Sequence, residues 1–184
     1  MKRAENEPGA GKAIRHNTEV FAGLYEQYMP MVFRYINYRV GKIHLAEDLT
    51  STVFEKALTK FESYSADKAS FSTWIFTIAR NTLIDHFRVS SKRKTIPIEE
   101  MPETSNREDS PENDVIHKEE LNHLKVCMGR LSQQEQEIIS LKFGAEITNR
   151  QIARMLGLSE SNVGTIIYRA VKKLRDGFVE WRNG

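Results

Sequence analysis

The stretch that most constrains the fold is residues 148–170, whose pattern predicts a helix, a tight turn and a second helix. Thr148 and Gln151 have the spacing of a capping box, in which each side chain satisfies a backbone N–H group at the helix start. Gly157 can adopt the left-handed backbone that ends this helix, and Ser159 can cap the next one. The pattern predicts a helix-turn-helix, which places its second helix in the DNA major groove, although a generic helical hairpin could share it.

Apolar residues recur at helical spacing on both helices of this motif. The first helix carries Ile152, Ala153 and Leu156, and the small Ala153 allows the two helices to cross closely. The expected buried stripe of the second helix consists of Val163, Ile167, Ala170 and Leu174.

Charge is distributed unevenly along the chain, although the formal net charge of its 184 residues is only +2. Residues 71–94 carry five Lys or Arg against one Asp, and residues 142–175 carry seven against two Glu. Between them, residues 95–120 carry nine Asp or Glu against two basic residues. Two basic blocks therefore flank an acidic one, and each basic block is a candidate surface for a polyanion.

Several functional classes are disfavoured by the sequence. Cys127 is the only cysteine, so no internal disulfide and no cysteine-built metal site are expected, and Cys127 itself should be a small buried residue. No apolar run approaches membrane-spanning length, which favours a cytoplasmic protein. No phosphate loop, nucleophile motif or metal-ligand spacing occurs, so the chain is not expected to be an enzyme or to need a cofactor.

Apolar spacing along the rest of the chain is mostly helical and predicts an all-α protein. We expect two small helical domains, residues 18–94 and 115–184, joined by a flexible acidic linker over residues 95–114, the second domain ending in the helix-turn-helix. Residues 1–17 lack an apolar period and are expected to form a disordered N-terminal extension. Pro30 should either kink the first helix or open a second one.

Within the first domain, the pattern predicts further helices over residues 44–60 and 70–91. Leu58 is expected to be buried with the apolar stripe of the first of these, and Phe87 with that of the second. Trp74 could stack on a nucleic-acid base, but its place in an apolar stripe favours core packing. In the second domain, Ser132 and Glu135 form another capping box, which predicts a helix over residues 133–143.

Three motifs occur in order at residues 46–54, 71–88 and 131–170, the last including the helix-turn-helix. Together they resemble the extracytoplasmic-function (group IV) sigma factors of the sigma-70 family of bacterial RNA polymerase. The resemblance covers nearly the whole chain after residue 17, and the acidic linker stands where housekeeping sigma factors have a third region. It implies a transient specificity subunit of the polymerase that binds two promoter elements and helps to melt the DNA.

The resemblance implies two sets of functional residues in the first domain. The promoter −10 element would be bound by Ser72, Arg80, Asn81, Asp85, Arg88, Lys92 and Arg93. The clamp coiled coil of core polymerase would be bound by Glu47, Asp48, Leu49, Thr52 and Phe54. Alternatives stay open for three of these residues. Glu47 and Asp48 could compensate the helix dipole, alone or in addition to docking, and Asp85 could instead fix Arg88 or another arginine.

For the second domain, the resemblance implies binding to the promoter −35 element and to the polymerase flap. The expected DNA contacts are Arg154, Ser161, Asn162, Gly164, Thr165, Tyr168, Arg169 and Lys172. Gly164 and Ile166 depart from the commoner family pattern, so the −35 sequence cannot be carried over from relatives. Gly164 could allow close approach of the backbone to DNA, and Ile166 could contact thymine methyl groups or widen the packing face.

The expected partners are therefore core RNA polymerase, promoter DNA and an anti-sigma factor. In the unbound protein the two domains should be tethered loosely or held by that inhibitor. Two other interpretations remain: a helix-turn-helix regulator that acts without core polymerase, and a sigma mimic that titrates an anti-sigma factor and never binds DNA.

Overall fold

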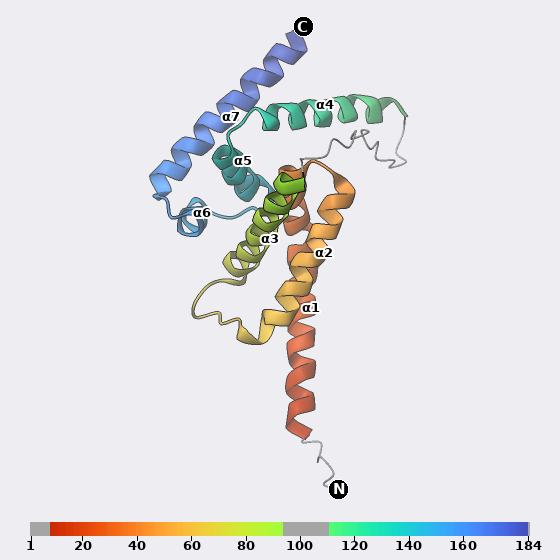
Figure 1. Ribbon diagram of the computed structural model, residues 1–184, viewed down its shortest axis with the longest axis vertical. Helices are drawn as coiled ribbons and strands as arrows, with labels where there is room; N and C mark the ends of the chain where they lie inside the picture. The colour runs from red at the N-terminus through yellow and green to blue at the C-terminus, as the bar shows by residue number, and fades with distance from the viewer. Residues whose placement is uncertain (1–7, 94–110, 184) are drawn as a thin grey trace.

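The computed structural model describes the backbone of residues 8–93 and 111–183, and the side chains of residues 18–90 and 119–182. It contains the helices α1 (Pro8–Val40), α2 (Ile43–Lys60), α3 (Phe71–Arg93), α4 (Pro111–Gly129), α5 (Gln133–Ile139), α6 (Asn149–Leu156) and α7 (Glu160–Asn183) (Figure 1). A 3-10 turn, η1 (Phe61–Ser63), follows α2, and a π-helical turn, η2 (Ser140–Gly144), follows α5. No strand occurs in the described ranges, and the all-α prediction is confirmed. We refer to α1–α3 as the N-terminal unit and to α4–α7 as the C-terminal unit.

Two helices begin earlier than the sequence pattern predicts. The helix α1 begins at Pro8 rather than at residue 18, so residues 8–17 of the expected disordered extension are helical, and residues 1–7 lie outside the described part. The helix α4 begins at Pro111, inside the expected linker, of which residues 95–110 are not described. Proline suits both starts, because the first turn of a helix leaves the backbone N–H group without a partner anyway.

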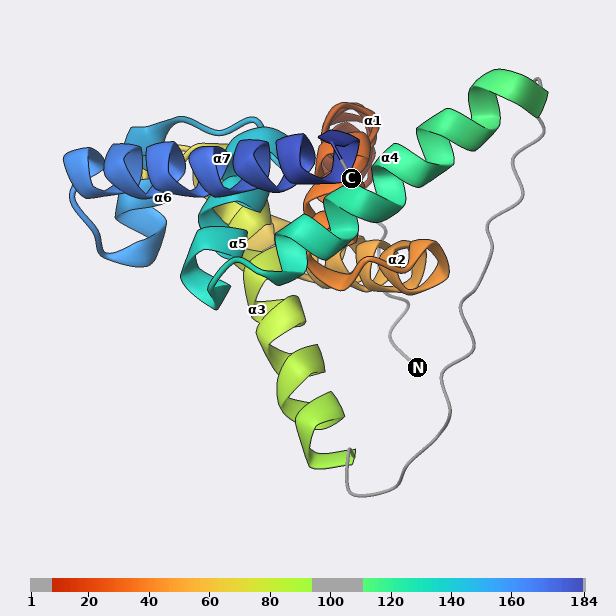
Figure 2. The same ribbon diagram turned by 90° about the horizontal axis from the view of Figure 1, so that it is seen from above.

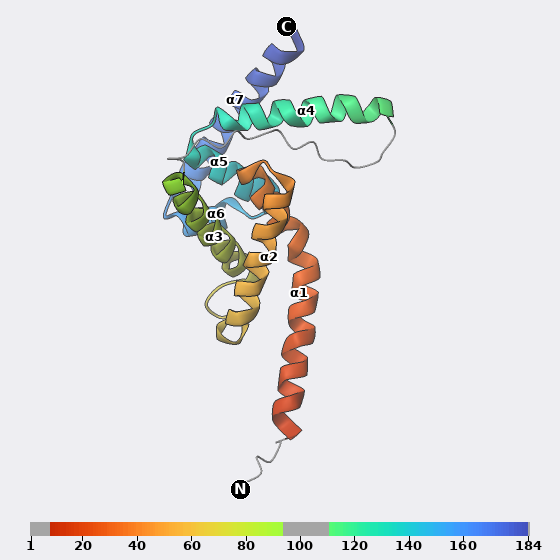
Figure 3. The same ribbon diagram turned by 45° about the vertical axis from the view of Figure 1, so that its right-hand side comes forward.

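The helix α1 continues through Pro30 instead of restarting there. It ends at Val40, and the next residue, Gly41, has a φ of 69°, in the left-handed region that glycine adopts at low cost. The N-terminal half of α1 projects beyond the other helices, whereas its C-terminal half lies against α2, α3 and the C-terminal unit (Figure 3). This C-terminal half therefore supplies most of the contacts between the two units, and α3 supplies others.

The two units pack against each other, so the expectation of loose tethering is wrong, whereas the alternative that an inhibitor holds them stays a prediction. One hydrophobic core contains fully buried side chains of both units, including Tyr35, Ile36, Val53, Ile75, Phe76, Ile138, Leu141, Ile152 and Val163. Full burial of a side chain the size of Ile138 contributes about 1.5–3 kcal/mol, so the apolar contact between the units is a substantial stabilising term. A smaller cluster within the C-terminal unit contains Met128, Leu131, Ile139 and Ala170.

The turn η2 lets the C-terminal unit approach α1 at van der Waals distance. The N–H of Ala145 donates to the carbonyl of Ser140 at 3.0 Å, five residues back, which widens the last turn after α5. Gly144 lies so close to α1 that a Cβ at this position would be 2.9 Å from the Cα of Tyr35. Only glycine fits this contact without movement of one backbone. Helix α5 is therefore shorter than predicted, and its continuation is a π turn.

The helices α4 and α7 pack against each other at one end of the molecule (Figure 2). Cys127 is buried there, as predicted, and its Sγ atom is 3.2 Å from Nε2 of His123. The ring of His123 stacks on Trp181 at a centroid distance of 4.8 Å and meets the edge of Phe178 at 5.1 Å. The C-terminal aromatic residues thus fold back onto α4. None of the described helices is long and apolar enough to cross a membrane.

Candidate nucleic-acid interface

The helices α6 and α7 form the predicted helix-turn-helix, and its local hydrogen bonds hold both helix starts. Thr148 Oγ1 accepts from the N–H of Gln151 at 3.3 Å, and Gln151 Oε1 accepts from the N–H of Thr148 at 3.0 Å. Gly157 ends α6 with a φ of 67°. Ser159 Oγ accepts from the N–H of Asn162 at 3.2 Å and caps α7. These predictions from the sequence are confirmed.

The outer side of α7 is an exposed polar surface, which we define as the recognition face. It consists of Ser161, Asn162, Thr165, Tyr168 and Arg169, all of them exposed. Tyr168 is 73% exposed, a large value for an aromatic side chain. Arg154, Arg169 and Lys172 are exposed as well, and none of them pairs with an acidic residue in the described part of the chain. The positive charges beside the recognition face are therefore available to DNA phosphates.

The two unusual residues of α7 lie beside the recognition face. Gly164 is half-buried, and a Cβ there would lie 3.9 Å from Nδ2 of Asn149 on α6, an ordinary contact. Ile166 is half-buried against the main core. Ile166 therefore widens the apolar face with which α7 packs on the core, which is one of the two roles considered for it.

The residues predicted for the −10 element follow one another along α3. Asn81, Asp85 and Arg88 are exposed, whereas Ser72 and Arg80 are half-buried. Arg88 Nη2 donates to Asp85 Oδ1 at 3.1 Å, so Arg88 is the partner of Asp85 in the structure. Lys92 and Arg93 lie in the last turn of α3, and their side chains are outside the described set.

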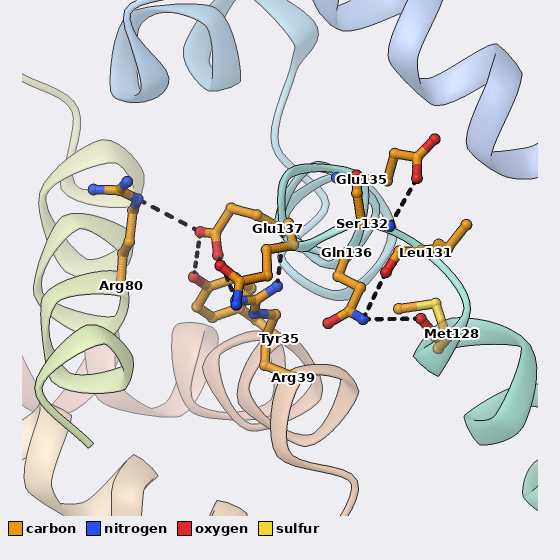
Figure 4. A network of polar contacts seen from close by, with 10 residues as sticks. Tyr35, Arg39, Arg80, Met128, Leu131, Ser132, Glu135, Gln136 and Glu137 are labelled. Atoms are coloured by element: carbon orange, nitrogen blue, oxygen red, sulfur yellow. Dashed lines mark hydrogen bonds and ion pairs between the residues drawn. The ribbon is translucent and has the colours of Figure 1, made fainter. Parts of the chain in front are cut away.

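Arg80 differs from its neighbours because it meets an acidic residue of the C-terminal unit (Figure 4). Glu137 on α5 accepts a hydrogen bond of 2.7 Å from the hydroxyl of Tyr35 through its Oε1 atom. The same oxygen is 3.6 Å from Nε of Arg80, and Oε2 is 3.3 Å from Nη2 of Arg39. The side chains of Arg39 and Glu137 are only 10% and 13% exposed. One carboxylate of the C-terminal unit is therefore bound between three donors of the N-terminal unit.

Tyr35 is fully buried at this contact, and burial raises the pKa of its phenol well above 10.0. The nearby negative charge of Glu137 and the hydrogen bond to it raise the pKa further, whereas Arg39 and Arg80 act in the opposite direction. The hydroxyl therefore stays protonated at neutral pH and acts as a donor toward Glu137.

Aromatic residues gather where the loop after α2 joins α3. The ring of Trp74 packs against Tyr64 and Phe71, at centroid distances of 5.1 Å and 5.4 Å. Tyr28 of α1 packs on Phe71 at 5.0 Å. Trp74 thus belongs to an aromatic cluster beside the core, in agreement with the packing interpretation. Its edge remains partly exposed.

Comparison with known protein families gives two matches in the same order as the two units. The model for sigma-70 region 2 matches residues 24–93. The model for sigma-70 region 4 matches residues 127–176. The chain belongs to the extracytoplasmic-function sigma factors. In this sigma factor, α3 is part of region 2 and the helix-turn-helix is part of region 4.

Individual relatives agree with this assignment. The sigma factor BldN of Streptomyces coelicolor is 38% identical over 89% of this chain, which spans 62% of the length of BldN. SigM of Bacillus subtilis is 29% identical over 83% of this chain and 91% of its own length. Among solved structures, the sigma factor RpoE of Bartonella quintana, in complex with the anti-sigma factor NepR, has a TM-score of 0.68 at 20% identity. It covers 87% of this chain and 97% of its own, and shows the same fold.

The structure separates the five residues predicted for polymerase docking. Glu47, Asp48 and Thr52 lie on the outer side of α2. Leu49 and Phe54 are 9% and 5% exposed and belong to the core, so they support this surface rather than form it. The carbonyl of Asp48 accepts from Thr52 Oγ1 at 2.9 Å, and Glu47 Oε2 is 3.3 Å from Nδ1 of His44.

Other residues depart from the sequence interpretation or were missed by it. Leu58 was expected inside, yet it is 57% exposed on α2. Phe87 is 38% exposed and lies under the guanidinium of Arg39. Glu137 was not recognised as a contact of Arg80, because nothing in the local pattern points to a partner on another helix. Among the described residues, no three His, Cys, Asp or Glu side chains lie close enough to hold a metal ion.

Proposed function

We propose that this sigma factor binds core RNA polymerase, recognises the −35 and −10 promoter elements and helps to melt DNA at the start of transcription. The observation that carries the proposal is the presence, in one chain, of an uncovered recognition face on region 4 and a polar, partly basic helix α3 on region 2. One surface suits duplex DNA, and the other lies beside an aromatic cluster that suits unpaired bases. The protein would supply binding energy rather than covalent chemistry, and would act in the cytoplasm with the polymerase.

At the −35 element, we propose that α7 enters the major groove with its recognition face. Asn162 and Arg169 carry amide and guanidinium groups that can read adenine and guanine edges. Ser161 and Thr165 can hold phosphates, and Arg154 and Lys172 add positive charge at the rim of the contact.

At the −10 element, we propose that Asn81 and Arg88 contact the non-template strand while the aromatic cluster around Trp74 receives an unstacked base. Extrusion of a base costs unstacking energy, which stacking on aromatic side chains and phosphate contacts offset. The exposure of Asn81 and Arg88 supports this proposal.

For core polymerase, we propose docking through the outer side of α2. Glu47 and Asp48 supply negative charge near the start of α2, and the exposed Leu58 near its end and Tyr25 on α1 supply apolar area. An apolar centre with a charged rim is the usual composition of a protein interface. Region 4 would contact the flap of the polymerase.

Relatives with known structures suggest an inhibitor as a further partner. RpoE of Bartonella quintana is in complex with the anti-sigma factor NepR, and CnrH is in complex with the cytosolic domain of CnrY. We propose that an anti-sigma factor likewise inhibits this protein. A groove of about 640 Å³ between α1, α4 and α5 is lined by apolar side chains, with Arg39, Lys42 and Lys125 as its charged residues. This lining suits an amphipathic helix with acidic residues.

Run-off transcription tests the proposal. Purified core polymerase should initiate from new start sites on a promoter library only when this protein is added. A regulator that acts without polymerase would bind promoters alone, and a sigma mimic would give no new start sites. In the same assay Asp48→Arg should weaken binding to core polymerase, with no loss of duplex −35 binding. Thr59→Ala, at an exposed site of α2 without a proposed contact, serves as the matched control.

A further inference from the structure

We propose that Tyr35, Arg39 and Arg80 form an anion pocket that binds a backbone phosphate of promoter DNA, and that Glu137 occupies this pocket when the two units are packed together. The inference rests on the proposed promoter binding and adds two things to it. It assigns a phosphate site to residues of α1, and it assigns to Glu137 the role of an internal competitor of DNA.

The anion pocket is built by the N-terminal unit alone. Tyr35 and Arg39 lie one turn apart on α1, and Arg80 faces them from α3 (Figure 4). The ring of Tyr35 meets the edge of Phe76 on α3 at 5.7 Å, and the guanidinium of Arg39 lies over Phe87 at 5.7 Å. These two ring contacts lie within the N-terminal unit, and Arg39 Nη1 additionally donates to the carbonyl of Gln133 on α5 at 3.3 Å. Because of the ring contacts, the pocket should persist when the C-terminal unit moves away.

The carboxylate of Glu137 fills the anion pocket incompletely. The Nε atoms of Arg39 and Arg80 are both buried and make no hydrogen bond. The ion pair of Arg80 with Glu137, at 3.6 Å, is longer than a hydrogen bond. A phosphate is larger than a carboxylate, and its oxygens point out of a single plane, so it suits donors that approach from α1 and from α3. Arginine is also the side chain best matched to phosphate.

Departure of Glu137 would leave the anion pocket with uncompensated charge. Within the described residues, Arg39 and Arg80 pair with no acidic side chain other than Glu137. Two guanidinium groups brought side by side by α1 and α3 favour a replacement anion. The nearest polyanion in the proposed function is the promoter strand bound along α3.

DNA and the C-terminal unit would compete for the same part of α3. Besides the contact with Arg80, Nε2 of Gln151 on α6 lies 3.5 Å from Oγ of Ser70, directly before α3. The packed arrangement thus covers the start of α3 and its middle turn at once. Because both ligands cannot occupy this surface, opening of the two units and binding of the −10 strand are thermodynamically coupled.

Glu137→Gln in the full chain tests the inference, because it removes the charge and keeps the shape. The readouts are the affinity for a single-stranded −10 oligonucleotide without polymerase, and the distance between fluorophores on the two units. We expect a gain in affinity of about tenfold with a longer distance, because apparent affinity scales with the open fraction. Adding Arg39→Gln to this variant should reverse most of the gain and lower the salt dependence of binding by about one counterion.

The matched control is Glu146→Gln, which removes an exposed ion pair between the units, the one with Arg34. It lies outside the anion pocket and should leave the affinity within about twofold. Should Glu137→Gln lose its helical circular dichroism, Glu137→Asp serves instead, because the shorter carboxylate withdraws from Arg80.

A longer distance without a gain in affinity would overturn the phosphate site. If neither the distance nor the affinity changes, the competition between Glu137 and DNA is overturned as well. Run-off transcription by the wild-type protein separates these results from a failure of the proposed function. If the wild type supports new start sites but Glu137→Gln gains no oligonucleotide affinity, only the further inference fails. If the wild type gives no new start sites, the proposed function fails.

Discussion

The recognition face of α7 and the residues of α3 proposed to bind the −10 element differ in how far the folded chain itself covers them. On α7, all five residues of the recognition face are exposed, and Arg169 has no acidic partner among the described residues. On α3, Arg80 is paired with Glu137, and Ser70 just before the helix accepts from Gln151. The first surface is exposed by its own local fold, whereas the second is covered at Arg80 and at Ser70 by residues distant in sequence, and leaves Asn81, Asp85 and Arg88 exposed.

This difference implies different conditions for the two proposed DNA contacts. The recognition face could meet a duplex as soon as the protein reaches it, because only water would have to leave. The α3 residues proposed for the −10 element would first have to lose the contacts of Arg80 and Ser70 with the C-terminal unit, and that loss would reduce the net affinity for DNA. Core polymerase, which would hold the two units apart, would therefore be required more strictly for the −10 contact than for the −35 contact.

Gly144→Ala should break the packing between the units and have the largest effect. A Cβ at this position would lie 2.9 Å from the Cα of Tyr35, a backbone atom that cannot rotate away. We expect a loss of about 2–3 kcal/mol in the free energy of unfolding, measured by urea denaturation. Gly129→Ala is the matched control, since nothing lies within 4 Å of a Cβ there. Equal effects of the two changes would contradict the close contact.

Arg169→Ala and Arg80→Ala should separate the two surfaces. Arg169→Ala should weaken duplex −35 binding by about 2 kcal/mol and leave the free energy of unfolding unchanged, because the side chain is exposed. Arg80→Ala should lower the free energy of unfolding and leave duplex −35 binding unchanged, because Glu137 then loses one of its partners in a largely buried site. Fluorescence anisotropy with duplex DNA and thermal unfolding give the two readouts. If both variants lose duplex affinity equally, the surfaces are not independent.

The sequence predicted best those features that depend on neighbours three or four residues apart. Both capping boxes, at Ser132 and at Thr148, were predicted and are confirmed, as is the left-handed end of α6 at Gly157. In each case the donor, the acceptor and the backbone angle belong to one short segment, so residue type alone determines the outcome. The family motifs likewise matched region 2 and region 4 in the expected order.

Features that depend on the packing of distant segments could not be predicted. Tyr35 and Glu137 are 102 residues apart in sequence, and nothing in either local pattern indicates that one would donate to the other. Leu58 occupies an apolar position of α2, yet the face it lies on has no described partner helix. Helical periodicity identifies an apolar stripe, but it does not tell which element covers the stripe, or whether any does.

Gly164→Ala tests whether the backbone of α7 beside the recognition face contacts DNA. Alanine at a helix interior position is favoured over glycine by about 0.5–1 kcal/mol, and a Cβ here would have only an ordinary contact with Asn149. We therefore expect a more stable protein whose −35 affinity stays within about twofold, measured by thermal unfolding and anisotropy. A loss of affinity beyond about tenfold would instead place the backbone at this position against DNA.

The pH dependence of stability tests whether an ion pair within the C-terminal unit, between Lys173 and Glu135, stabilises that unit. The hydrogen bonds from Lys173 and from the backbone N–H of Ser132 lower the pKa of Glu135 below 4.5. A lowered pKa means that the stabilisation is present above pH 4.5 and is lost as the pH falls through the lower value in the folded state. Lys173→Ala should reduce that loss, and should cost less than about 1 kcal/mol at neutral pH because the lysine is exposed.

Lys172→Ala is the matched control for this change, because Lys172 is exposed on the next position of α7 and pairs with no described acidic residue. Its unfolding free energy should follow the wild-type pH profile between neutral pH and about pH 3, measured by urea denaturation at each pH. Identical profiles for Lys172→Ala and Lys173→Ala would mean that the Glu135 contact does not stabilise the folded state. A smaller slope for Lys173→Ala alone would show that the C-terminal unit maintains its helix packing through its own ion pair. Contact with the N-terminal unit would then govern access to α3 rather than the integrity of the helix-turn-helix.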